Sequence, residues 1–359
     1  MTAPRPVPSG EHAAPRVLRA DATRMYQEAA SAPEAVARQL EQNAARVEAI
    51  GAILRARPPR VVVTCARGSS DHAATYAKYL IETRARVLTV SAAPSVSSVY
   101  GVDQDLRDGL FIAISQSGRS PDLLASVAAA KRSGATVLAL CNDIEAPLNE
   151  LADHTIPLWA GAEKSIAATK SYIASLAALA HLTATWTGDG ALLAAVRGLP
   201  SALELAWQLD WSEALPVLVP VSHLYVIGRG LGLGVAQEAA LKCKETCGLH
   251  AEAFSGAEVR HGPFALLGKG FPALLLAQDD ATRAGLEALA GELAGRGVDV
   301  LLAGGSTPGA RILPTLPGPA TVAPLMHAAS AYRLVVNLAI ARGLDPDRPP
   351  FLRKVTETV

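Results

Sequence analysis

The stretch that decides the fold, residues 110–141, reads "LFIAISQSGRSPDLLASVAAAKRSGATVLALC". Its two apolar runs, residues 110–115 and 136–141, have the length of buried strands. Between them, "PDLLASVAAAKRSG" carries apolar residues at helical spacing. A strand, a helix and a second strand in this order form a βαβ unit, whose two strands run parallel in one sheet. The stretch therefore predicts an α/β protein.

The same alternation continues toward the N-terminus. "RVVVTCARGSS" at residues 60–70 is another buried-strand run, followed by the helical "DHAATYAKYLIETRA" and the strand-like "RVLTVSA". Ahead of them, residues 31–54 open with Ser31 as an N-cap and Pro33 in the first turn, and continue with apolar residues at helical spacing. We expect this segment to be an amphipathic helix that packs on the α/β unit.

The pattern then repeats after helical segments at residues 163–186 and 189–215. "LYVIGRGLGLG" resembles "VVVTCARGSS", and "FPALLLAQDD" resembles "LFIAISQS", with equivalent glycines and glutamines offset by about 162 residues. The chain is therefore predicted to be a tandem of two similar α/β units. The expected parts are a disordered N-terminal tail at 1–22, an N-terminal helix plus first unit at 23–200, a second unit at 201–345 and a C-terminal tail at 346–359.

The composition excludes several classes of partner. Lys plus Arg and Asp plus Glu both number 33, so no net charge attracts nucleic acid or an anionic membrane. The first twenty residues carry no apolar core of signal-peptide length, and no later stretch reaches eighteen apolar residues without a charge or a turn former. The four cysteines are too scattered for a disulfide framework, which agrees with a reducing compartment. We expect a soluble cytoplasmic protein that needs no cofactor.

A metal site is one reading of Cys243 and Cys247, which stand one helical turn apart with His250 and His261 downstream. Structural zinc sites usually have a tighter cluster of four ligands. We therefore predict no metal, and expect both cysteines to be small buried residues of the core.

The polar segment "SQSGRSPD" follows directly on the strand at residues 110–115. In open α/β sheets ligands bind beyond the carboxyl ends of the strands. Ser120 is a natural N-cap, Pro121 fits the first helical turn, and Gly118 allows a tight turn. Hydroxyls and exposed amides here predict a phosphate site, and Ser69 and Ser70 of "RGSSD" can close on the same phosphate.

Two alternatives apply to these loops. The serines can serve only as helix caps, and a nucleotide can be the ligand instead of a small monophosphate. Because no G-x-x-x-x-G-K-[ST] motif is present, the monophosphate is favoured.

"SQSGRSPD", "KSIAATKSY", "EAALKCKETCGLHAEAFSGAEVRHGP" and the terminal "FLRKVTETV" together resemble the double sugar isomerase (SIS) domain family, in particular the isomerase half of glucosamine-6-phosphate synthase. The resemblance runs from about residue 24 to the end. It implies two αβα sandwiches, each with a mainly parallel sheet, and a hexose 6-phosphate substrate. It also implies phosphate contacts from Ser70, Ser115, Gln116, Ser117 and Ser120, and sugar contacts from Ser69, Ile166, Ala167 and Ala168.

The resemblance also implies the catalytic residues. Glu245, three residues after Lys242 on a helix, would move a proton between C1 and C2, and a nearby ammonium would keep its carboxylate ionised. The simpler interpretation is an ordinary helical ion pair. His261 of "RHGP" would serve ring opening in the neighbouring subunit, which implies a homodimer. Lys354 matches the lysine that meets the open-chain sugar carbonyl.

The synthase carries a glutaminase domain with a catalytic N-terminal cysteine ahead of this region, whereas Thr2 follows Met1 here. We therefore expect no ammonia from glutamine, and the resemblance favours a stand-alone glucosamine-6-phosphate deaminase. Three alternatives stay open: a tagatose-6-phosphate ketose/aldose isomerase, a fructosamine-6-phosphate deglycase, and a sugar-phosphate sensor without enzymatic activity.

Overall fold

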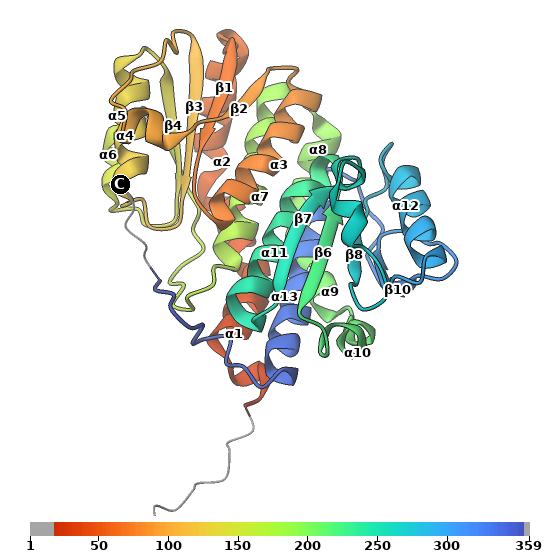
Figure 1. Ribbon diagram of the computed structural model, residues 1–359. Coiled ribbons are helices and arrows are strands. Elements are labelled where there is room, and N and C mark those ends of the chain that lie inside the picture. Colours follow the sequence, from red (N-terminus) through yellow and green to blue (C-terminus); the bar gives the residue numbers. More distant parts are fainter. Residues whose placement is uncertain (1–17, 355–359) are drawn as a thin grey trace, which may run out of the picture.

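The computed structural model of the protein describes residues 18–354 and contains two sheets of five parallel strands each (Figure 1). In the first sheet the strand order is β2-β1-β3-β4-β5. Its strands are β1 (Val61–Cys65), β2 (Thr89–Ser91), β3 (Gly109–Ser115), β4 (Thr136–Cys141) and β5 (His154–Pro157).

The second sheet repeats this topology. Its strands are β6 (His223–Gly228), β7 (His250–Ser255), β8 (Ala273–Leu276), β9 (Val300–Ala303) and β10 (Arg311–Leu313). They run in the order β7-β6-β8-β9-β10, so each sheet places its second strand on one side of its first strand and the other three on the opposite side. The predicted tandem of two parallel α/β units is confirmed.

Helices form three layers around the two sheets (Figure 1). α4 (Pro94–Ser98), α5 (Pro121–Arg132) and α6 (Pro147–Leu151) cover the outer face of the first sheet, and α12 (Arg283–Gly295) covers that of the second. The layer between the sheets contains α2 (Ala32–Ala56), α3 (Ser69–Arg84), α7 (Lys170–Thr187), α11 (Leu233–Cys247) and α13 (Ala323–Ala341).

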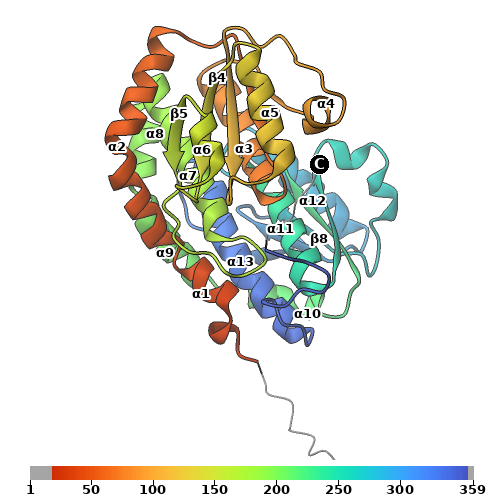
Figure 2. The same cartoon turned by 90° about the vertical axis from the view of Figure 1, so that its left-hand side faces the viewer.

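Shorter helices connect and flank these elements. One of them, α9 (Leu199–Gln208), packs with α7 along the long helix α2 (Figure 2). The remaining helices are α1 (Arg24–Ala30), α8 (Gly190–Arg197) and α10 (Leu215–Leu218), and the 3-10 helices are η1 (Ala20–Ala22), η2 (Ser212–Ala214), η3 (Gly230–Gly232), η4 (Glu258–Arg260) and η5 (Pro263–Leu266). No helix within residues 18–354 is both long and apolar enough to cross a membrane.

Successive side chains of a strand point to opposite faces of the sheet. One face contributes to a central apolar cluster between the two sheets, and the other to an outer cluster under the covering helices. Val62 and Leu110 join the central cluster, whereas Val63 and Phe111 join the outer one. The central cluster also takes Leu224 and its neighbours from the second sheet. Because both units share this core, the predicted boundary at residue 200 stays a prediction.

Several local expectations need correction. Ser31 and Ser120 do occupy N-cap positions, but neither side chain bonds to its helix, and the Ser31 hydroxyl donates instead to the carbonyl of Glu28. Residues 20–22, expected in a disordered tail, form η1, and residues 1–17 lie outside the described residues. The sequence pattern also gave no sign of β5, β7 and β10.

The two units meet most closely where α11 crosses α3. Gly234 makes this possible, because a Cβ atom there would lie 2.5 Å from the carbonyl oxygen of His72 and 3.1 Å from the amide nitrogen of Tyr76. Backbone atoms cannot move aside as a flexible side chain can. The contact therefore requires glycine on the α11 side.

We predict that Gly234→Ala lowers the free energy of unfolding by about 1–3 kcal/mol, the usual cost of overpacking a core. Urea denaturation followed by circular dichroism measures the change. Gly285→Ala in exposed α12 is the matched control, because its Cβ would meet nothing within 4 Å. It should leave stability unchanged or raise it by up to about 1 kcal/mol. Equal stability of both variants would contradict the close packing.

Candidate active site

A cleft of about 390 Å³ lies at the carboxyl ends of β1 and β3, and five separate chain segments contribute to it. The segments are the start of α3, the loop between β3 and α5, the approach to α7, the middle of α11 and the C-terminal segment. The lining residues are Arg67, Gly68, Ser69, Ser70, Ile114, Ser115, Gln116, Ser117, Ser120, Leu123, Ile166, Ala168, Lys242, Glu245, Leu352, Arg353 and Lys354.

The serine loop after β3 has a fixed shape. Ser115 is buried at the end of the strand, and its Oγ accepts a hydrogen bond of 2.9 Å from the amide of Gly118. Gly118 has a φ of 62°, and a Cβ atom there would lie 2.7 Å from Cys141 Sγ. Glycine is therefore required here, and the tight turn expected from the sequence is confirmed. Since Ser120 does not cap α5, its hydroxyl stays free for a ligand in the cleft.

Arg67, which the sequence analysis did not single out, brings a positive charge to the same loops. Its Nη2 lies 2.7 Å from Oδ2 of Asp122, a carboxylate that is only 1% exposed. Asp122 also accepts a hydrogen bond from the amide of Leu123 in the first turn of α5. The guanidinium is thus fixed at the rim of the cleft, where the N-termini of α3 and α5 also favour an anion.

Lys242 lies in the floor of the cleft and its side chain is completely buried. Its Nζ is 3.5 Å from Oε1 of Glu238 and forms an ion pair with Oε2 of Glu245. Glu238 is itself held by two other helices, because Nδ1 of His72 lies 2.9 Å from its Oε2 and Tyr332 donates a hydrogen bond of 2.9 Å to its Oε1. The helical ion pair given above as the simpler interpretation does form, and it is one part of a buried network.

The charged groups of this network stabilise each other's ionised form, as the directions of their pKa shifts show. Burial alone would raise the pKa of Glu238, but the ammonium of Lys242 and the hydrogen bonds from His72 and Tyr332 lower it below its usual value. Burial would likewise lower the pKa of Lys242, but the carboxylates of Glu238 and Glu245 raise it. Both groups are therefore ionised near neutral pH. Glu245, with a side chain 21% exposed, is the member that a ligand can reach.

Lys354 enters the cleft from the C-terminal segment and pairs with a second buried carboxylate. Its Nζ lies 3.2 Å from Oε2 of Glu163, whose side chain is fully buried. Sequence reasoning missed Glu163, and it missed His72, Glu238 and Tyr332 as well. Glu238 is an acid within the largely apolar first half of α11, which is the one signal it offered. Glu163 was expected at the start of a helix over residues 163–186, but that expectation is wrong, because α7 begins only at Lys170.

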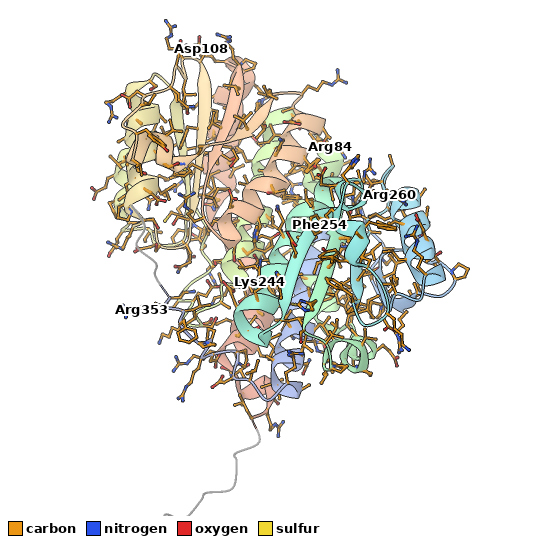
Figure 3. The ribbon with its side chains drawn as sticks, in the orientation of Figure 1. Arg84, Asp108, Lys244, Phe254, Arg260 and Arg353 are labelled. Atoms are coloured by element: carbon orange, nitrogen blue, oxygen red, sulfur yellow. The ribbon has the colours of Figure 1, made fainter. Side chains whose placement is uncertain are left out.

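The structure brings most of the predicted site residues together. The cleft holds Ser69, Ser70, Ser115, Gln116, Ser117, Ser120, Ile166, Ala168, Lys242, Glu245 and Lys354. Ala167 does not line it, because this residue is buried in the central apolar cluster. His261 does not line it either, since it is exposed on the loop between η4 and η5. Figure 3 shows its neighbour Arg260 far from Arg353 of the C-terminal segment.

The cysteines expected in the core do lie there. Cys243 and Cys247 are buried in the central cluster, and Cys247 Sγ donates toward the carbonyl of Val335 on α13. Among residues 18–354, no three His, Cys, Asp or Glu side chains gather as metal ligands.

A family model for the SIS domain matches residues 57–184 and 218–303, which together make up more than half of the chain. The chain belongs to the SIS domain family. The matched segments contain β1 to β5 of the first sheet and β6 to β9 of the second.

Individual relatives agree with this membership. A glutamine–fructose-6-phosphate aminotransferase (isomerizing) of Aeropyrum pernix is 34% identical over 309 residues, covering 80% of this chain and 49% of that protein. The SIS chain thus spans about half the length of the curated relatives it matches.

Two solved structures cover nearly the whole chain. A proposed phosphosugar isomerase from Silicibacter pomeroyi DSS-3 has a TM-score of 0.88 and 43% identity, covering 90% of this chain and 100% of that one. The C-terminal domain of glucosamine-fructose-6-phosphate aminotransferase from Francisella tularensis has a TM-score of 0.83 and 25% identity, covering 91% and 98%. The architecture of this SIS protein is therefore found in both.

We predict that Lys242→Met lowers the free energy of unfolding by about 3–5 kcal/mol, because it leaves the buried Glu238 carboxylate without its ammonium partner. Chemical denaturation at neutral pH measures the loss. Lys244→Met, at an exposed position of the same helix, serves as control and should change stability by less than about 0.5 kcal/mol. A small and equal effect of both substitutions would show that the network contributes little.

Proposed function

We propose that this SIS protein is a phosphosugar isomerase and deaminase that converts glucosamine 6-phosphate and water to fructose 6-phosphate and ammonia. The observation that carries the proposal is that the serine loops and the Glu245–Lys242 pair line one cleft. The relatives that act as aminotransferases of fructose 6-phosphate and the neighbour named as a phosphosugar isomerase support the substrate class.

In this proposal the phosphate binds between Ser70 and the loop of Ser115, Gln116, Ser117 and Ser120. Arg67 and the N-termini of α3 and α5 offset its negative charge. Ser69, Ile166 and Ala168 contact the sugar. Because the phosphate is fixed at the rim, the other end of the sugar chain reaches toward Glu245 and Lys354.

The reaction begins with opening of the sugar ring to a C1 aldehyde, for which Lys354 and His261 are the proposed acid and base groups. Glu245 then removes the proton from C2, and the C2–H electron pair forms the C1=C2 bond of an enolamine. Lys242 and Lys354 stabilise the negative charge that develops on O1. Return of the proton from Glu245 to C1, with one proton passing from the amine nitrogen to O1, yields an imine at C2 and a hydroxyl at C1. Water adds to this imine, and ammonia leaves to give fructose 6-phosphate.

His261 lies outside the cleft of its own chain, so its proposed role requires a second copy. We propose a homodimer in which the η4–η5 loop of each chain completes the cleft of the other. The exposed position of His261 at the start of this loop, beside Gly262 with a φ of 124°, supports a contact of that kind.

The assay that tests the proposal follows ammonia and fructose 6-phosphate during incubation with glucosamine 6-phosphate. Both products should appear in equal amounts. Turnover of tagatose 6-phosphate or of fructosamine 6-phosphates without ammonia from glucosamine 6-phosphate would replace the deaminase with one of those activities. Binding without any turnover would favour a sensor.

Glu245→Gln should reduce turnover by at least about 10³-fold, because a neutral amide cannot accept the C2 proton. Affinity for the sugar phosphate, measured by calorimetry, should stay within about threefold, since Glu245 makes no contact with the phosphate loops. Ser117→Ala is the matched comparison and should instead weaken binding, by about tenfold for one lost charge-assisted hydrogen bond. Undiminished turnover in Glu245→Gln would remove this residue from the mechanism.

A further inference from the structure

Glu163 is a fully buried carboxylate that the proposed chemistry does not use. Its Oε1 accepts hydrogen bonds from the amides of Thr169 (3.0 Å) and Ser171 (3.1 Å). Its Oε2 accepts one of 2.7 Å from the Ser171 hydroxyl and one of 3.2 Å from the ammonium of Lys354. One carboxylate therefore connects the start of α7 with the C-terminal segment.

Glu163 replaces the N-cap side chain of α7 by accepting hydrogen bonds from amides at the start of this helix. Thr169 stands at the N-cap position, but its side chain makes no cap hydrogen bond and its hydroxyl is buried without a partner. The amides at the helix start are satisfied by Glu163 instead, and a negative charge is favourable at this end of a helix. This bonding closes the chain between residues 163 and 171 into a loop, and that loop presents Ile166 and Ala168 to the cleft.

The C-terminal segment has a second point of attachment. Asp347 accepts hydrogen bonds from the first amides of α1, 2.7 Å from Arg24 N and 2.9 Å from Met25 N. Beyond it, Phe351 has a positive φ of 64° and an exposed side chain, and Leu352 to Lys354 line the cleft. The segment is thus held at Asp347, outside the cleft, and at Lys354, inside it.

The two ammonium groups of the cleft have different partners. Lys242 is bound by Glu238 and Glu245 on its own helix, so its position is set by α11. Lys354 comes from a segment without regular structure, and its one ion pair within residues 18–354 is with Glu163. Its place in the cleft is therefore determined by a carboxylate and not by a helix.

We propose that Glu163 is a positioning residue of this site, which fastens the C-terminal segment across the cleft and sets the ammonium of Lys354 beside the reacting end of the sugar. The proposal rests on the proposed function for its catalytic consequence. The fastening itself requires no substrate. Loss of the Glu163 charge frees the segment, opens the cleft and leaves Lys354 without a fixed position.

The first test measures the fastening alone, by trypsin cleavage after Arg353 or Lys354 in the intact ligand-free protein, with mass spectrometry of the released peptide. Glu163→Gln should raise the initial cleavage rate by about tenfold, because cleavage follows the population of the open form. Glu28→Gln is the matched control. Glu28 accepts the amides of Lys164 (2.5 Å) and Ser165 (3.0 Å) in the same loop but does not contact Lys354. The Glu28→Gln variant should be cleaved at the same rate as the wild-type protein.

The second test is a double-mutant cycle on kcat with Glu163→Gln, Lys354→Met and the double variant. A displaced catalytic group costs on the order of 10²-fold in rate, so Glu163→Gln should lose about that factor. The double variant should be no slower than Lys354→Met alone, because Glu163 acts through Lys354. Multiplicative losses would overturn the positioning role and leave Glu163 as a structural residue of α7.

The two tests separate this inference from the proposed function. If wild-type protein does not turn over glucosamine 6-phosphate, the proposed function fails while the cleavage rates still decide the fastening. If wild type is active and Glu163→Gln keeps both wild-type turnover and a protected C-terminal segment, the inference alone is wrong.

Discussion

The cleft depends on how the protein neutralises one ammonium in its interior. A buried lysine is strongly unfavourable unless carboxylates pair with it and hydrogen bonds satisfy those carboxylates in turn. Lys242 meets this condition through Glu238 and Glu245, and Glu238 meets it through His72 on α3 and Tyr332 on α13. Because Ser69 and Ser70 are the first residues of α3, the contacts that stabilise the buried charge also fix the separation between these serines and Glu245. The interactions that neutralise the buried Lys242 are thus the same ones that determine the geometry of the site.

This constraint also explains why two units of the same topology contribute differently. The loop after β3 contains serines and a tight turn at Gly118. The corresponding loop after β8 has Asp279 and Asp280 following Gln278 instead. Asp280 accepts from the amide and hydroxyl of Thr282, and Gln278 donates to Thr282 and to the carbonyl of Arg229. These side chains are hydrogen-bonded to one another, and the carboxylates among them repel an anion. The second unit therefore offers no counterpart of the serine loop and contributes α11 with its charges instead.

The parts of this arrangement that local patterns encode were predictable from the sequence. Parallel strands, the tandem repeat and the serine loop each follow from a continuous stretch of residues, and the resemblance supplied Glu245 and Lys354. Contacts between distant segments were not predictable: His72 and Glu238 are 166 residues apart, and Glu163 and Lys354 are 191 residues apart. The short strands β5 ("HTIP") and β10 ("RIL") were missed because they are not part of longer apolar runs such as those that mark β2 and β8. Ser120 was predicted as a phosphate contact, but it was also expected to cap its helix, as N-cap residues usually do, and its side chain makes no such bond.

In the proposed function, the distribution of charge along the cleft would give a bound sugar phosphate a single direction. At the rim, Arg67 and two helix N-termini present positive charge, and the serine loop adds hydrogen-bond donors. Lys242 and Lys354 line the other end of the cleft, and the three carboxylates that pair with them, Glu245 in the cleft and Glu163 and Glu238 behind it, outnumber the two ammonium groups. This charge distribution attracts a phosphate dianion to the rim and repels it from the floor, so under the proposed function the uncharged carbonyl end of the sugar would face Glu245. The two lysines would then meet that end as hydrogen-bond donors without attracting the phosphate, because the carboxylates already compensate their charge. Orientation of the ligand thus follows from the same pairs that make the interior stable.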